Sequence, residues 1–325
     1  MPTDNIANLS IGEVARLTGV NPVTLRAWQR RFGLVIPQRT PKGHRLYSQE
    51  QVQQIREILS WLEQGVAISK VKPLLSGQTE KQLQQENEDD DWLKFSSSLT
   101  EAALSLSSAR FGRLLDEFSA LYPIALCCRR LRHWLQVLDT QLDERLDGAL
   151  VRSWLESRLA HYVGARSEQL LRQKPRWQLL YLPLGKQPAW SELLLQLELI
   201  TRGVSLLPLN IEEPLEGQGL QLLAHRLPLQ GLLLLPPSQL PGSSVKALFQ
   251  LASALDYPLI LSGDYVAAHA SAFEHYAKEL AVTEKGANKN REPVKSPVLC
   301  SSNAAILALL GQAESASASK QPEDK

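Results

Sequence analysis

The sequence predicts a multidomain protein of the α + α/β class, and three observations support this prediction. Two short helical patterns joined by a glycine turn open the chain, and a basic stretch rich in β-forming residues follows them. Helical periodicity then dominates residues 92–174. From residue 175 onward, short apolar runs alternate with helical patterns, which is typical of a doubly wound parallel sheet.

Changes in composition divide the chain into five predicted segments. We expect a small domain of helices and a hairpin at 1–77, an acidic linker at 78–91, a helical bundle at 92–174, a sheet domain at 175–311 and a disordered tail at 312–325. The linker and the tail are polar, so neither is expected to bury an apolar core of its own.

The first predicted helix runs from Ile11 to Thr18. Ser10 and Glu13 have the spacing of a capping box, in which each residue satisfies a free backbone N–H group of the other. Gly19 then allows a tight turn. The residues expected to be buried are Val14, Ala15 and Leu17.

A second helix should begin after this turn. Asn21 can cap it, and Pro22 suits the first helical position because the proline lacks an N–H group that would be unpaired there anyway. Leu25, Trp28 and Phe32 recur at spacings of three and four, so they should form the buried face, with Trp28 in the core. The residues on the sides predicted to be exposed are Thr24, Arg26, Arg30 and Arg31.

A basic hairpin should follow. Residues 34–46 contain β-formers around a turn at Thr40–Gly43, and they place Arg39, Lys42, His44 and Arg45 on the hairpin. Two further helices are predicted, one from Ser48 to Gly65 and one from Ile68 to Leu75. Two short helices followed by a basic hairpin indicate a winged helix-turn-helix, whose second helix enters the major groove of DNA.

The local charge agrees with a DNA-binding function. Between residues 10 and 77 there are ten Lys or Arg residues and four acidic residues, a net charge of +6, whereas the whole chain carries +1. A cationic excess confined to one domain is the expected electrostatic signature of phosphate binding. We therefore predict contacts to double-stranded DNA from Asn21, Thr24, Arg26, Arg30, Arg31, Arg39 and Lys42.

The same residues carry a family resemblance. The segments Ile11-Gly-Glu-Val-Ala, Thr24-Leu-Arg-Ala-Trp-Gln-Arg-Arg-Phe-Gly-Leu34, Pro37-Gln-Arg-Thr and Gly43-His-Arg-Leu-Tyr47 resemble the winged helix-turn-helix of MerR-type transcription regulators. The Arg-Ala-Trp variant is similar to a branch that contains regulators of curli and light-sensing cobalamin regulators. The resemblance covers about the first quarter of the chain. It implies wing contacts from His44, Arg45 and Tyr47.

The resemblance also implies how such a protein acts. We expect a transcription regulator that binds promoter DNA as a homodimer or higher symmetric oligomer, so its operator should be an inverted repeat. Members of the family often activate transcription by distorting the promoter for RNA polymerase, and this branch implies control of biofilm genes.

Other features argue against membrane, secreted and metal-binding classes. No segment is long and apolar enough to span a bilayer, and the N-terminus lacks a signal peptide. The three cysteines have neither metal-ligand spacing nor a disulfide pattern. Nothing in the predicted bundle indicates catalysis, because its histidines, His133 and His161, stand alone. We therefore expect a cytoplasmic protein that is not an enzyme.

The final third should contain the parallel sheet. Strands are predicted at Trp177–Pro183, Val204–Leu209, Gly231–Leu235, Pro258–Leu261 and Val298–Cys300, with helices at Ser191–Arg202, Leu220–Arg226, Val245–Leu255 and Asn303–Leu310 and a polar insertion at Thr283–Pro297. A bundle followed by such a Rossmann-like, flavodoxin-like sheet resembles the cobalamin-binding half of the light-sensing regulators.

The loop that would hold cobalamin departs from the family pattern. In that pattern an acid, a histidine two positions later and a glycine three after that follow the first strand. Here Lys186 replaces the acid, Pro188 the histidine and Ser191 the glycine, and the paired glycines after the fourth strand read Ser262-Gly263. Because proline offers no lone pair to a metal, we infer that the domain has lost its cobalamin and serves in assembly or binds another ligand.

Three rival functions stay open at this point. The first is a true cobalamin-dependent light sensor, which the changed loop disfavours. The second is a corrinoid-dependent methyltransferase or mutase subunit, which would share the bundle and the sheet but has no use for a DNA-binding domain. The third is an architectural DNA-binding protein, for which the C-terminal half would be surplus.

Overall fold

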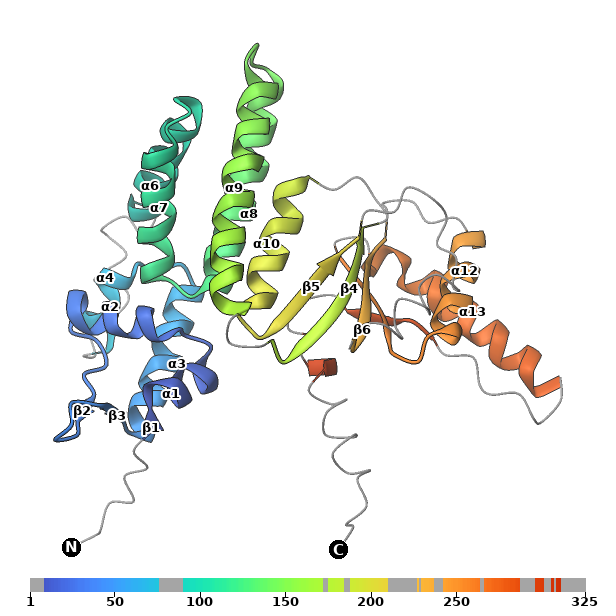
Figure 1. Ribbon diagram of the computed structural model, residues 1–325, viewed down its shortest axis with the longest axis horizontal. Helices are drawn as coiled ribbons and strands as arrows, with labels where there is room; N and C mark the ends of the chain where they lie inside the picture. Colours follow the sequence, from blue (N-terminus) through green and yellow to red (C-terminus); the bar gives the residue numbers. More distant parts are fainter. Residues whose placement is uncertain are drawn as a thin grey trace, which may run out of the picture. The chain divides into compact units, whose positions relative to one another are not determined.

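The structure is a computed structural model that describes residues 9–75, 90–171, 175–183, 188–209, 227, 229–236, 242–263, 266–286, 296–300, 305–306 and 308–310. The chain divides into two compact units, Met1–Gly164 and Ala165–Lys325, and the division falls within one long helix. Each unit is described separately below, with the element labels of Figure 1. The predicted segment boundaries are not tested by this division, and the predicted tail at 312–325 lies outside the described residues.

The first unit opens with a small antiparallel sheet and four helices. The elements in chain order are β1 (Leu9–Ser10), α1 (Ile11–Thr18), α2 (Pro22–Phe32), β2 (Gln38–Arg39), β3 (Arg45–Tyr47), α3 (Gln49–Glu63) and α4 (Ile68–Leu75). The sheet has the order β1-β3-β2, with Leu9 opposite Tyr47 and Arg39 opposite Arg45. This is the predicted winged helix-turn-helix arrangement, to which the structure adds the unpredicted strand β1.

Helix α1 differs from the prediction in which of its side chains are buried. Helix α1 has the expected bounds and buries Val14, but the Leu17 side chain is 43% exposed. The prediction that Leu17 is buried was therefore wrong. The spacing of apolar residues indicates which side of a helix faces the core. The width of the buried face depends on the neighbouring helices, and no neighbouring element of the described chain covers the side chain of Leu17.

The core of this region reaches into the helices that follow. Trp28 is completely buried, as predicted, and packs in one apolar cluster with Leu25, Ile55 and Leu126 of a later helix. Its indole Nε1–H donates a 2.7 Å hydrogen bond to the backbone carbonyl of Leu121. Helix α2 is thus attached to the bundle by apolar packing and by a directional hydrogen bond.

Four antiparallel helices complete the described part of this unit. They are α6 (Asp90–Leu104), α7 (Ser108–Leu121), α8 (Ile124–Asp143) and α9 (Gly148–Leu171), and α9 continues past the division into the second unit. Helix α6 starts within the predicted acidic linker, whose residues 78–89 lie outside the described ranges. The break after α7 coincides with Pro123, which cannot donate a backbone hydrogen bond.

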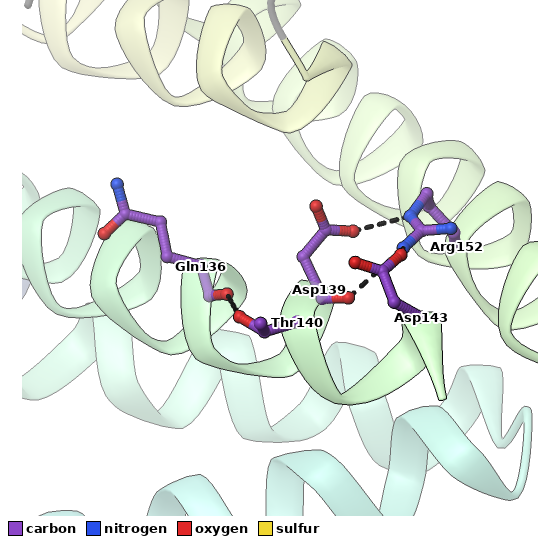
Figure 2. Close-up of polar contacts among 5 residues, drawn as sticks. All are labelled: Gln136, Asp139, Thr140, Asp143 and Arg152. Carbon is purple, nitrogen blue, oxygen red and sulfur yellow. Dashed lines mark hydrogen bonds and ion pairs between the residues drawn. The ribbon is translucent and has the colours of Figure 1, made fainter. Parts of the chain in front are cut away.

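A charged cluster joins α8 to α9. The Arg152 guanidinium lies between two carboxylates, with Nε 2.5 Å from Asp139 Oδ1 and Nη2 2.8 Å from Asp143 Oδ1, as Figure 2 shows. Nη2 also donates to the Asp139 carbonyl, and Thr140 Oγ1 donates to the Gln136 carbonyl one turn away. These groups are partly exposed, so they fix the orientation of the hairpin more than they stabilise it.

The second unit contains a five-stranded parallel sheet. Its elements are β4 (Trp177–Pro183), α10 (Ala189–Ile200), β5 (Val204–Pro208), β6 (Gly231–Leu235), α12 (Gly242–Ala254), β7 (Leu259–Ser262), α13 (Val266–Gly286) and β8 (Val298–Cys300). All pairings between neighbouring strands are parallel, in the order β5-β4-β6-β7-β8. This is the flavodoxin-like order, in which the chain reverses direction across the sheet between the first and third strands.

Side chains of the sheet alternate between two apolar cores. Leu180 and Leu182 of β4 face the core that includes α12 and α13, whereas Leu179 and Tyr181 face the core that includes α10. Because both faces are covered, the strands read as continuous apolar runs, such as Gly231–Leu235. The predicted doubly wound sheet is confirmed.

One helix of this unit was not predicted, and one predicted helix cannot be compared with the structure. The sequence reading assigned no helix to 266–282, yet α13 runs from Val266 to Gly286 and overlaps the predicted polar insertion. Its apolar signal is weak because few of its described side chains, among them Val266 and Phe273, contact the core. The helix predicted at Leu220–Arg226 lies outside the described residues. No helix within the described ranges is long and apolar enough to cross a membrane.

Trp28→Phe should lower the free energy of unfolding by roughly 2 kcal/mol, because the Leu121 carbonyl loses its donor and a cavity opens in the core. The measurement is urea denaturation followed by circular dichroism. Trp61→Phe is the matched control, because the buried Trp61 indole N–H has no partner among the described residues. Equal losses in both variants would contradict a specific role for the hydrogen bond to Leu121.

Candidate nucleic-acid interface

The helix-turn-helix is built from local hydrogen bonds that the sequence specifies. Ser10 Oγ accepts the Glu13 N–H while Glu13 Oε2 accepts the Ser10 N–H at 2.7 Å, which closes the capping box at the start of α1. This hydrogen bonding to Ser10 lowers the pKa of Glu13. The helix ends at Gly19, whose φ of +73° is a left-handed conformation that favours glycine. The turn therefore has the geometry that its residues require.

Helix α2 is fixed at both ends in the same way. Asn21 Oδ1 accepts the N–H groups of Val23 and Thr24 at 2.7 and 2.9 Å, and Pro22 occupies the first helical position. At the other end, Gly33 adopts a φ of +61°. The amide oxygen of Asn21, a predicted DNA contact, is thus already used as the helix cap.

The exposed face of α2 is basic. Arg26, Arg30 and Arg31 are exposed, whereas Leu25 and Trp28 are buried. Positions 26 and 30 lie one turn apart on one side of the helix, so their guanidinium groups can reach the same groove. Within the described chain, none of these three arginines forms an ion pair with a carboxylate, so their charges are available to phosphates or base edges.

Thr24 does not belong to this face. Its side chain is completely buried, and its hydroxyl has no hydrogen-bond partner among the described residues. The prediction that Thr24 shares the exposed side with Arg26 and Arg30 was therefore wrong. A threonine is small enough to be covered by its neighbours, and sequence spacing alone cannot distinguish a covered threonine from an exposed one.

The wing is a short hairpin with exposed cations. Its turn is closed by the Gly43 N–H donating to the Thr40 carbonyl at 2.8 Å and by the Thr40 N–H donating to the His44 carbonyl at 2.9 Å. Arg39, Lys42 and His44 are exposed around this turn. Three of the predicted wing residues are therefore accessible to a DNA backbone.

One hydrogen bond connects the wing to helix α2. Arg45 is half-buried, and its Nε donates to Gln29 Oε1 at 3.3 Å. The bond uses only one of the five donors of the guanidinium, so Arg45 can position the wing and still contact a phosphate. Gln29 was not among the predicted site residues, because a single glutamine on a helix carries no distinguishing pattern.

Tyr47 belongs to the core of the domain. It is 1% exposed, and its hydroxyl has no hydrogen-bond partner among the described residues. Burial raises the pKa of Tyr47, while the nearby Arg45 and Arg26 charges partly oppose that shift. The expected wing contact from Tyr47 was therefore wrong, since the side chain is the inward-facing residue at the end of β3.

Val23 is a residue of this surface that the sequence analysis missed. Its side chain is 57% exposed and lies three positions before Arg26, on the same side of α2. An exposed apolar side chain next to a cation can contact the methyl group of thymine in a major groove. The only available signal was a β-branched apolar residue in the first turn of a basic helix, which is too common to be specific.

The second candidate site, the loop after β4, has a different chemistry. Pro188 is exposed and stands at the start of α10, where its carbonyl accepts the Ser191 N–H at 2.8 Å. Lys186 lies outside the described residues. After β7, Gly263 has a φ of +111°, so this turn keeps one position that favours glycine.

These residues do not fit a cobalt ligand set. The Pro188 side chain has no donor atom, and Ser191 uses its backbone N–H within the helix start. Burial raises the pKa of Glu192 in the first turn of α10, so the carboxyl there is less acidic than usual.

Comparison with known proteins identifies the N-terminal domain. Residues 9–78 match the family described as MerR HTH family regulatory protein. The chain is 56% identical over 77 residues to the HTH-type transcriptional regulator MlrA of Salmonella typhimurium and 58% identical over 73 residues to MlrA of Escherichia coli. These matches cover 24% and 22% of this chain and only 32% and 30% of the two MlrA proteins, about a third of their length. From these matches, residues 9–78 form a MerR-type winged helix-turn-helix.

Two further matches extend beyond that domain. The HTH-type transcriptional repressor CarH of Myxococcus xanthus is 30% identical over 165 residues, which cover 46% of this chain and 55% of CarH. A crystal structure of a cobalamin-binding protein from Desulfitobacterium hafniense aligns over 67% of this chain and 97% of its own, with 15% identity and a TM-score of 0.28.

Arg26→Ala should weaken binding to a selected DNA sequence by about 1–3 kcal/mol, because one base or phosphate contact from the exposed face of α2 is lost. Fluorescence anisotropy at fixed salt measures this change. Thr24→Val is the matched control on the same helix: its buried side chain touches no DNA, so affinity should stay unchanged. Unchanged affinity in Arg26→Ala, or a loss in Thr24→Val at equal stability, would reject this assignment.

Proposed function

We propose that this protein is a transcription regulator that binds promoter DNA through the MerR-type winged helix-turn-helix at residues 9–78. The single observation that carries the proposal is the exposed, unpaired set of arginines on α2 beside the basic wing. The similar proteins MlrA and CarH are named as transcription regulators, which supports the same function. Promoter DNA as the partner implies a cytoplasmic location.

The geometry supports specific rather than only electrostatic binding. Helix α2 presents Arg26 and Arg30 from a rigid helix whose two ends are capped, and Gln29 ties the wing to that helix through Arg45. Rigid placement of two groove contacts reduces the entropic cost of ordering them on DNA. Backbone contacts from the wing then fix the position of the domain on the duplex.

We further propose that the regulator acts as a symmetric oligomer on an inverted repeat. One winged helix-turn-helix supplies one recognition helix, and a single such helix reads only a few base pairs. Two copies related by a two-fold axis double the contacts and explain how a small domain could select a promoter. Contact with RNA polymerase, activation of transcription and control of biofilm genes belong to the same proposal and rest on likeness to the MerR family.

No residue of the described chain supports an enzymatic role. The DNA-binding domain argues against a corrinoid-dependent methyltransferase or mutase subunit, since such a subunit needs no recognition helix. The large sheet domain argues against a purely architectural protein. We propose that the sheet domain is a sensor or assembly domain attached to the regulator.

Selection from random DNA followed by footprinting tests the function. We expect a single protected inverted repeat whose half-sites are separated by about 10 base pairs or a multiple of that number, with affinity that falls steeply as salt rises. Diffuse protection without any selected sequence would contradict a promoter-specific regulator and favour the architectural alternative. A protected site without two-fold symmetry would contradict the oligomer while leaving DNA recognition intact.

A second experiment tests the cofactor. We propose that the sheet domain does not retain cobalamin, because Pro188 stands where a cobalt-binding histidine would be required. The purified protein should be colourless after incubation with adenosylcobalamin or hydroxocobalamin and desalting, both in the dark and after illumination. Retained corrinoid absorbance would overturn this proposal and restore a light-sensing function.

A further inference from the structure

A cavity lies inside the first unit, at the junction between the winged helix-turn-helix and the helical bundle. Its volume is about 370 Å³, which falls within the range of small-molecule sites. The end of α2, the turn between α3 and α4, and helices α6, α7 and α8 all contribute to its walls. None of the functions proposed above uses it.

Aromatic rings form one wall of this cavity. The ring of Phe118 lies 4.6 Å from that of Phe95, 5.4 Å from that of Trp92 and 5.0 Å from that of Tyr122, measured between centroids. Trp92, Phe95 and Tyr122 are half-buried, so the cluster is open to the cavity on one side. Rings at these separations offer faces and edges on which another planar ring can stack.

Two arginine side chains line the same cavity. Arg31 comes from the last turn of α2, and Arg130 comes from α8, where its guanidinium lies 5.3 Å from the Trp92 ring centroid. Within the described chain, neither group forms an ion pair with a carboxylate. Lys94 and Glu117 also line the cavity and are both exposed, and their opposite charges cancel. The two arginines therefore give the site a net positive charge.

This combination selects for one class of ligand. A planar ring can stack against Trp92 and Phe95, and an anionic group on that ring can accept paired hydrogen bonds from a guanidinium. A neutral aromatic molecule would gain the stacking but not the charge-assisted hydrogen bonds, and a cation would be repelled by the arginines. We propose that the cavity is a binding site for a planar aromatic anion, such as a mono- or bicyclic carboxylate, sulfonate or phosphate.

The position of the site gives such a ligand access to the DNA-binding helix. Arg31 lines the cavity and is also one of the predicted DNA contacts. Leu121 lines the cavity too, and its backbone carbonyl accepts the hydrogen bond from the Trp28 indole. All of the residues that line the cavity belong to the first unit. Its existence does not depend on whether cobalamin binds or on which promoter is recognised.

The test uses 2-naphthoate as the probe and 2-naphthamide as its neutral counterpart, titrated into the full chain and followed by ligand-observed NMR. We expect saturable binding of 2-naphthoate with a Kd of about 1 mM or tighter. The amide should bind roughly tenfold more weakly, because it lacks the charge that the guanidinium groups recognise.

Variants locate the binding site. Arg130→Gln should weaken 2-naphthoate binding roughly tenfold, whereas Arg129→Gln, an exposed neighbour on α8 outside the cavity, should leave it within about twofold. Because Arg130→Gln also removes the stacking on Trp92, Arg31→Gln provides an independent variant at a second arginine that lines the cavity, and thermal unfolding confirms that each variant is folded. Equal affinity for the acid and the amide, equal effects of the Arg129 and Arg130 changes, or no saturable binding up to about 10 mM would overturn the proposal.

Discussion

The hydrogen bond from the Trp28 indole to the Leu121 carbonyl is the contact on which the first unit depends. Leu121 is the last residue of α7, and the final carbonyls of a helix have no partner within the helix. Pro123 follows closely and cannot donate an N–H group to that helix end. The recognition helix supplies the missing donor, so the DNA-binding domain and the bundle share one polar contact as well as an apolar core that includes Leu126.

Burial of Trp28 also decides which residues can meet DNA. With Leu25 and Trp28 turned into the core, the opposite side of α2 presents Val23, Arg26 and Arg30. The capped ends of the helix prevent fraying, and the bond from Arg45 to Gln29 holds the wing beside it. Packing of the apolar face of α2 against the core therefore also fixes the position of its basic face, which is the face available to DNA.

The sheet domain is stabilised by a different principle. Its strands are buried on both faces, and alternate side chains of β4 and β6 contact separate cores. Parallel sheets of this kind hold ligands at the carboxyl ends of their strands, near the reversal of strand order. At that edge Pro188 precedes α10, at the position where the family resemblance implies a cobalt ligand, and this substitution is the basis of our proposal that the domain does not retain cobalamin. The aromatic cavity in the first unit provides a separate place where a small molecule could act close to the recognition helix.

Local chemistry in the sequence was enough to determine several features. Ser10 with Glu13 and Asn21 with Pro22 specify helix starts through hydrogen bonds between near neighbours, Gly19 specifies the turn after α1, and the structure has these features where they were predicted. The basic hairpin and the class of the sheet followed from turn residues and from the alternation of strands with helices. Trp28 was also placed correctly in the core, because its spacing from Leu25 and Phe32 is that of one helix face.

Only the tertiary structure decided how far each buried stripe extends. Thr24 and Tyr47 proved to be covered and Leu17 proved to be exposed, since these outcomes depend on which neighbouring element lies over each side chain and not on its own spacing. Strand β1 and helix α13 were missed for the same reason: two residues of strand and a weakly apolar helix are stabilised by distant partners. The order of the five strands and the junction cavity likewise arise from contacts between residues far apart in the chain, which local sequence patterns do not encode.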